Sequence, residues 1–269
     1  AIPAASIDLP HSTQSLSWPT FRRGETYGGS SPLESDSVLR NWLELVTWRQ
    51  RESALAESFR AVLASLLFSG GEHRESRVIV ITSACSSEGK TTVACNLAVA
   101  LAETGQKVLI IDADRRRPRL HEVFKVPNRY GFFDLLNDKA RLLPRGTTSL
   151  TYRSDIPGLY VLPSGELNAE TANLVGNQCL AELLNRLRGT FDVVLIDTPP
   201  VLALSDARAL GRAADGVALV IRANSTPHDA AFAAWQRLSE DGVAVLGTIL
   251  NNCDPKKGPD YHSYAQSTS

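Results

Sequence analysis

A lysine and a threonine at the end of a short loop are the first residues here that could do chemistry. The stretch ITSACSSEGKTTVACNLA (81–98) fits the phosphate-binding pattern G-x-x-x-x-G-K-[ST] in its last three places, but Ala84 stands where the first glycine is usual. Backbone N–H groups of residues 86–91 can point at phosphate oxygens, Lys90 can reach the outer phosphates, and the Thr91 hydroxyl can ligate Mg²⁺. Small residues still allow phosphate to approach the backbone, provided that no position needs a positive φ.

Aspartates stand where two strands are expected to end near this loop. Asp112 and Asp114 lie two residues apart in VLIIDADRRRPRL, and Asp197 follows the apolar run of FDVVLIDTPP. Ligands of open α/β sheets bind beside the carboxyl ends of the strands, and residues two apart on an extended strand face the same side. We therefore expect Asp112 and Asp114 to handle Mg²⁺ and a proton, and Asp197 to support the metal from a strand beside the loop.

Strands and helices that alternate along the chain must position these residues. Short continuous apolar runs are typical of buried parallel strands, and segments with helical spacing follow most of them. The expected strands are 77–83, 107–114, 159–165, 191–200, 216–223 and 244–252. The expected helices are 38–69, 90–105, 172–188, 206–214 and 227–242. This alternation predicts an α/β fold with a mostly parallel central sheet and helices on both faces, and the loop makes it a P-loop NTPase.

Composition separates one domain from two tails. Residues 1–36 are rich in Ser, Pro, Gly and Thr, and residues 255–269 are polar with Pro and Gly, so both are expected to be flexible. Residues 37–254 form the expected nucleotide-binding domain. A net charge of -1 gives no reason to expect a nucleic-acid partner. No stretch approaches the roughly 18 consecutive apolar residues of a membrane span.

The four cysteines, Cys85, Cys95, Cys179 and Cys253, form no C-x-x-C pair and have no zinc-ligand spacing. They are expected to be the reduced thiols of a cytosolic protein. Cys85 lies in the loop near Lys90 and a helix N-terminus, a setting that can lower the pKa of a thiol, and its alkylation would then block nucleotide binding. The alternative is that Cys85 is a small filler residue.

Three segments, SSEGKTT, VLIIDADRRRPRLHEVF and FDVVLIDTPPVLALSDA, resemble the cytoplasmic ATPase domain of bacterial tyrosine autokinases. These enzymes accompany regulators of capsule and exopolysaccharide chain length. The likeness runs from about Glu57 to Pro255, and the run D-x-D-x-R-[RK]-P-R-L at Asp112–Leu120 separates the family from its relatives. Those relatives, the plasmid-partitioning and division-site-placement ATPases, carry a signature lysine at the position of Cys85.

The resemblance implies a role for each matched position in the phosphate site. Lys90 would contact the β- and γ-phosphates of ATP, and Thr91 would ligate Mg²⁺. Asp112 would hold the metal shell, Asp197 would support it through water, and Asp114 would accept the proton of a tyrosine hydroxyl.

The wider ATPase class also has an adenine-contacting position, which Asn251 matches at the end of the last expected strand. The alternative is an asparagine that simply ends this strand. The residues expected to bind the nucleotide are therefore Ser86, Ser87, Glu88, Gly89, Lys90, Thr91, Thr92 and Asn251.

Two departures from the family concern self-association. The family's oligomer motif is E-x-x-R-x-x-R; Glu57 and Arg60 match it, but Leu63 replaces the second arginine. Glu57 and Arg60 would contact a neighbouring copy, or else form an ion pair within their own helix. The family's C-terminal tail carries a cluster of tyrosines, whereas only Tyr261 and Tyr264 follow the last expected strand. These two tyrosines are the expected phosphate acceptors.

The sequence thus favours an ATP- and Mg²⁺-dependent tyrosine autokinase that regulates exopolysaccharide or capsule polymerisation and export. The family implies a cytoplasmic location at the inner face of the membrane, reached through a membrane polysaccharide co-polymerase or an upstream anchor. Two alternatives stay open: a catalytically weak nucleotide-binding regulator of such a co-polymerase, and a partitioning or positioning ATPase.

Overall fold

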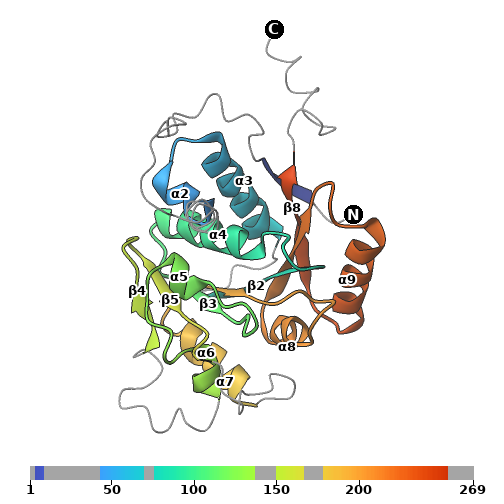
Figure 1. Cartoon of the computed structure of the whole chain (residues 1–269). Helices are drawn as coiled ribbons and strands as arrows, with labels where there is room; N and C mark the ends of the chain where they lie inside the picture. The colour runs from blue at the N-terminus through green and yellow to red at the C-terminus, as the bar shows by residue number, and fades with distance from the viewer. Residues whose placement is uncertain (1–3, 9–42, 70–75, 137–149, 167–177, 254–269) are drawn as a thin grey trace, which may run out of the picture.

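An eight-stranded sheet forms the centre of the protein, with the strand order β1-β8-β7-β2-β6-β3-β5-β4 (Figure 1). The computed structural model describes residues 4–8, 43–69, 76–136, 150–166 and 178–253. All neighbouring strands pair in parallel except β4 and β5, which pair antiparallel.

The elements follow one another in an alternating series. The strands are β1 (Ala4–Asp8), β2 (Arg77–Ser83), β3 (Val108–Asp112), β4 (Tyr152–Arg153), β5 (Leu159–Leu162), β6 (Val193–Asp197), β7 (Gly216–Arg222) and β8 (Val245–Cys253). The helices are α2 (Val46–Arg49), α3 (Ala54–Ser69), α4 (Lys90–Glu103), α5 (Leu120–Val123), α6 (Phe132–Leu136), α7 (Gln178–Arg188), α8 (Asp206–Ala213) and α9 (His228–Glu240).

Helices cover both faces of the sheet and bury a separate apolar layer on each. Because successive side chains of a strand point to opposite faces, Ile79 and Ile81 of β2 pack with α2, α3, α4 and α5, whereas Val78 and Val80 pack with α6, α7, α8 and α9. The central strands β2, β3 and β6 can be mostly apolar because both of their faces are covered.

The phosphate loop lies where the direction of the chain connections reverses. β2 pairs with β6 on one side and with β7 on the other. The chain passes from β2 through α4 to β3 beyond β6, and it later passes from β6 through α8 to β7 on the opposite side of β2. A reversal of this kind opens a crevice at the carboxyl ends of the strands. Asp112 and Asp197 end β3 and β6 directly opposite each other at this edge.

The expected α/β fold with its mostly parallel sheet is confirmed. The helical spacing expected over 38–69 is present in α2 and α3, and the chain turns at residues 50–53 between them. Ser53 accounts for the new start: its hydroxyl accepts the Ala56 N–H at 3.1 Å and donates to the Gln50 carbonyl at 2.7 Å. The short elements α5, α6 and β4 were not predicted.

Residues at both ends of the chain depart from the expected tails or lie outside the description. Ala4–Asp8, within the tail expected over 1–36, form β1 in parallel with β8. The rest of residues 1–36 and all of 255–269, with Tyr261 and Tyr264, lie outside the described residues. Among the residues that are described, no helix has both the length and the apolar character needed to cross a bilayer.

Candidate nucleotide-binding and phosphoryl-transfer site

The loop between β2 and α4 has the placement expected of a phosphate site. β2 ends at Ser83, α4 begins at Lys90, and Gly89 caps the helix with φ +87°. The N-terminus of a helix offers unpaired N–H groups to an anion. From the sequence, we assumed that no non-glycine position of the loop needs a positive φ. This assumption is wrong, because Ser87 has φ +65°. A serine therefore stands in a left-handed position that favours glycine.

Lys90 is held at the centre of the site by the carboxylate that the sequence assigned as a base. Its Nζ lies 3.0 Å from Oδ2 of Asp114, and its side chain is only 14% exposed. Burial lowers the pKa of Lys90, but the Asp197 and Asp114 carboxylates raise it further, so its pKa lies above the ordinary value. The lysine is therefore a charged, partly buried group facing carboxylates.

Asp112 is fully buried and organises the turn after β3. Its carboxylate accepts the N–H groups of Asp114 at 3.1 Å, Arg119 at 2.8 Å and Leu120 at 3.0 Å. Burial and the charge of Asp197 nevertheless raise the pKa of Asp112 to about 7. The same turn positions Asp114, whose Oδ1 accepts two further backbone N–H bonds within it.

Thr91 and Asp197 form the second polar pair of the site. The Thr91 hydroxyl donates to Oδ2 of Asp197 at 2.6 Å. Oδ1 of Asp197 is buried and has no hydrogen-bond partner among the described residues. Burial raises the pKa of Asp197 to about 6, although Lys90 and the Thr91 hydroxyl act in the opposite direction.

This pair fits the Mg²⁺ that accompanies a nucleotide. The orphaned Asp197 oxygen and the Thr91 hydroxyl offer oxygen ligands, and Mg²⁺ usually takes one or two protein groups together with substrate phosphates and waters. No group of three or more His, Cys, Asp or Glu side chains within the described ranges could hold a metal ion by itself. Such a site would therefore depend on the phosphates to complete the metal's ligands.

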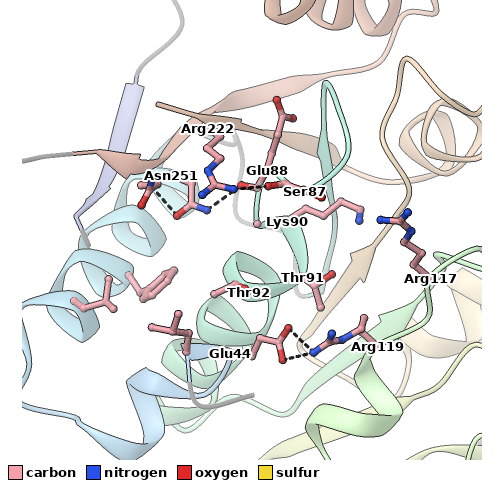
Figure 2. A pocket seen from close by; sticks show the side chains of 15 residues that line it. Glu44, Ser87, Glu88, Lys90, Thr91, Thr92, Arg117, Arg119, Arg222 and Asn251 are labelled. Carbon is pink, nitrogen blue, oxygen red and sulfur yellow. Dashed lines mark hydrogen bonds and ion pairs between the residues drawn. The ribbon is translucent and has the colours of Figure 1, made fainter. Parts of the chain in front are cut away.

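A cavity of about 490 Å³ opens beside these groups (Figure 2). The predicted residues that line it are Ser87, Glu88, Gly89, Lys90, Thr91, Thr92 and Asn251. Ser86 does not belong to the lining. Sequence reasoning missed the other lining residues, which are Leu43, Glu44, Leu55, Phe59, Arg117, Arg119, Arg222 and Asn252.

Asn251 meets the loop in this structure. Its Nδ2 donates to the Glu88 carbonyl at 2.9 Å, and its Oδ1 accepts the Asn252 N–H at 3.0 Å. The side chain still lines the cavity. An adenine contact by Asn251 stays a prediction.

One wall of the cavity is an ion pair between distant segments. The Arg119 guanidinium donates to both carboxylate oxygens of Glu44 at 3.1 Å, and Glu44 is 3% exposed. Asn96 of α4 holds the same segment, since its side chain accepts the Thr47 N–H at 2.9 Å and donates to the Leu43 carbonyl at 2.9 Å. Glu44 and Arg119 are 75 positions apart, so no local pattern could have joined them.

Cys85 does not have the environment that the sequence suggested. Burial and the carboxylate of Glu88 raise the pKa of its thiol instead of lowering it. Besides burial, the reason is that Oε2 of Glu88 accepts the Cys85 N–H at 2.8 Å, which brings a carboxylate close to the thiol. The expectation of a lowered thiol pKa at Cys85 is therefore wrong.

Glu57 and Arg60 lie on α3, and within this chain they pair with each other. Arg60 contacts Glu57 at 3.2 Å and Glu103 of α4 at 3.0 Å. Leu63, at the place of the second family arginine, is a buried core residue. The ion pair within α3, which the sequence left as an alternative, is thus present. A contact of Glu57 and Arg60 with a second copy stays a prediction.

Comparison with known proteins decides the family. A family model described as an AAA domain matches residues 76–231. The tyrosine-protein kinase YwqD of Bacillus subtilis (strain 168) is 34% identical over 220 residues, which cover 82% of this chain and 90% of that protein. This chain belongs to the bacterial tyrosine-protein kinase family.

Solved structures place this kinase-family chain among P-loop ATPases. The kinase domain of the Escherichia coli tyrosine kinase ETK matches with a TM-score of 0.76 and 28% identity, over 96% of this chain and 92% of that one. The septum site-determining protein MinD of Pyrococcus horikoshii OT3, complexed with Mg-ADP, matches with a TM-score of 0.55 and 30% identity, over 65% and 70% of the two chains. The resemblance to tyrosine autokinases and their relation to division-site ATPases are confirmed.

Proposed function

We propose that this chain transfers the γ-phosphoryl group of ATP to protein tyrosines, its own Tyr261 and Tyr264 among them, in an Mg²⁺-dependent reaction. The observation that carries the proposal is the 3.0 Å pair between Lys90 and Asp114 at the phosphate loop. It sets a cation for phosphate and a candidate proton acceptor side by side.

The residues divide the work of phosphoryl transfer between them. When the phosphates bind, Lys90 turns from Asp114 to the outer phosphate oxygens, whose charge it neutralises. Asp114 is then free to accept a proton, and the two N–H bonds to its Oδ1 keep it oriented. Thr91, Asp197 and the buried Asp112 would hold Mg²⁺, which supplies further neutralisation of the phosphoryl charge.

The reaction balances with these groups. The tyrosine oxygen forms a bond to the γ-phosphorus, and its proton passes to the Asp114 carboxylate. The bond between the γ-phosphorus and the β–γ bridging oxygen breaks, and its electron pair leaves with ADP. A tyrosine hydroxyl has an ordinary pKa of about 10, so an acceptor for its proton is needed at neutral pH.

We further propose that the partner is a membrane polysaccharide co-polymerase, which the family resemblance supports. The kinase would then act at the inner face of the cell membrane and regulate exopolysaccharide or capsule polymerisation. A catalytically weak nucleotide-binding regulator is the second candidate. This candidate is favoured by Leu63, which is buried where the family's oligomer motif has an arginine. Weaker self-association would bring fewer tail tyrosines to the active site of a second copy.

One experiment separates the two candidates. The protein is incubated with γ-labelled ATP and Mg²⁺, with and without the membrane partner, while phosphotyrosine and released phosphate are measured together. If the chain is a tyrosine kinase, the parent should form phosphotyrosine. The Asp114→Asn variant should form none, although it should still bind nucleotide with the parental affinity. Nucleotide binding without phosphotyrosine in any condition would reject the kinase and support the regulator.

A further inference from the structure

The phosphate loop carries a left-handed residue that is not glycine. Ser87 has φ +65°, while the second left-handed loop position, with φ +87°, is Gly89. A side chain makes the left-handed conformation unfavourable, and such residues persist where their surroundings enforce it. Something other than its own sequence must therefore hold the loop at Ser87.

Two side chains from neighbouring strand ends bind the carbonyl groups of this part of the loop (Figure 2). Nη1 of Arg222, at the end of β7, donates to the Ser87 carbonyl at 3.1 Å. Nδ2 of Asn251, near the end of β8, donates to the Glu88 carbonyl at 2.9 Å. In a trans peptide the C=O and the following N–H point in opposite directions. These bonds therefore also fix the directions of the Glu88 and Gly89 N–H groups, which are expected to bind phosphate.

The Glu88 side chain provides a third attachment of the loop. It is 3% exposed, and its two carboxylate oxygens accept separate bonds. Oε2 accepts the Cys85 N–H at 2.8 Å, and Oε1 accepts the hydroxyl of Thr226 in the β7–α9 connection. The Thr226 oxygen also accepts the Arg222 N–H at 3.0 Å, so the two β7-side contacts support each other.

We propose that Glu88, Thr226, Arg222 and Asn251 act as a clasp that holds Ser87 in the left-handed conformation, which a glycine would adopt without such support. These positioning residues hold Ser87 left-handed, and with it the N–H groups that receive the phosphates. The clasp rests on the nucleotide-binding part of the proposed function and not on tyrosine transfer. It assigns the β7–α9 connection to the binding site, although Thr226 does not line the cavity.

A double-mutant cycle between Thr226 and Ser87 tests the clasp, with ADP·Mg²⁺ affinity measured by calorimetry. Thr226→Val removes the hydroxyl, and Ser87→Gly removes the need for the clasp. In the parent background Thr226→Val should weaken affinity about 5- to 30-fold, the equilibrium equivalent of the left-handed penalty. In the Ser87→Gly background the same change should weaken it less than about twofold.

Controls separate this effect from a general loss of structure. Thr226→Ser keeps the hydroxyl and should restore parental affinity. Thr190→Val removes a hydroxyl at the opposite edge of the sheet, where it bonds the Arg186 carbonyl at 3.4 Å, and should leave affinity unchanged. If Thr226→Val does not fold, Arg222→Ala removes an exposed member of the clasp and must show the same coupling to Ser87→Gly.

Equal loss of affinity in both backgrounds would overturn the clasp, because Ser87 would then not be what Thr226 supports. If Thr226 and Ser87 are coupled in ADP·Mg²⁺ affinity but the labelling experiment finds no phosphotyrosine, the clasp is supported and the kinase proposal is rejected. A parent that binds no ADP·Mg²⁺ would overturn both.

Discussion

The buried Asp112 carboxyl should make the ligand-free protein less stable as the pH rises from about 4 to about 7. Its pKa is raised to about 7 by burial and by the Asp197 charge, whereas an unfolded aspartate titrates near 3.9. The folded state therefore binds the Asp112 proton more tightly than the unfolded state does. The stability that it contributes is complete below about pH 4 and is lost as the pH rises through about 7.

The size of this effect follows from the separation of the two pKa values. About 3 units correspond to roughly 4 kcal/mol of unfolding free energy, an upper bound because Asp112 and Asp197 titrate together. Asp112→Asn removes the titration. The asparagine oxygen can still accept the Arg119 and Leu120 N–H groups, but its NH₂ would face the Asp114 N–H, at a pH-independent cost of about 1–3 kcal/mol.

Urea unfolding of the nucleotide- and Mg²⁺-free protein between pH 5 and about 8 is the assay. At about pH 5 the Asp112→Asn variant should have a lower free energy of unfolding than the parent. At about pH 8 this difference in unfolding free energy should shrink or reverse. Asp155→Asn, on an exposed turn, is the matched control and should not change the slope. Parallel parent and Asp112→Asn curves over the whole range would refute the assignment of this proton to Asp112.

Three further expectations concern the loop and α3. Lys90→Ala should weaken ATP affinity about 10- to 100-fold by calorimetry, since a charged phosphate contact is lost; unchanged affinity would contradict its role. Cys85 should react with iodoacetamide more slowly in the folded than in the unfolded chain, because its thiol pKa is raised, and the alkylated protein should not bind nucleotide; faster reaction when folded would refute this. With Arg60 held by Glu103 and Leu63 buried, light scattering should find monomers or concentration-dependent oligomers, and a stable ring at low micromolar concentration would show that Leu63 is no obstacle.

The strands and the phosphate loop could be predicted because their signals are local. β2, β3 and β6 are continuous apolar runs with both faces covered, and the loop lies between a strand and a helix in one short stretch of sequence. The break before α3 could have been predicted from Ser53, whose side chain caps the helix. β4 has only two residues and makes no readable pattern.

The walls and supports of the site could not be predicted, because their partners are far apart in sequence. Glu44 meets Arg119 across 75 positions, and Thr226 meets Glu88 across 138. The left-handed Ser87 is a product of such contacts, so the loop composition alone could not reveal it. The raised pKa of the Cys85 thiol depends on burial and on the Glu88 carboxylate, which is only three residues away but is held in place by the distant Thr226 hydroxyl.

Tyrosine phosphorylation by this chain is tested by mapping phosphotyrosine after incubation of the full chain with ATP, Mg²⁺ and the membrane partner. We expect phosphate on Tyr261 or Tyr264 in the parent, none there in Lys90→Ala, and loss of most label in a Tyr261→Phe/Tyr264→Phe double variant. Tyr130→Phe, which alters an exposed tyrosine of the described domain, should keep the parental label. ATP hydrolysis without phosphotyrosine, or equal label in parent and Lys90→Ala, would show that this site does not phosphorylate tyrosine.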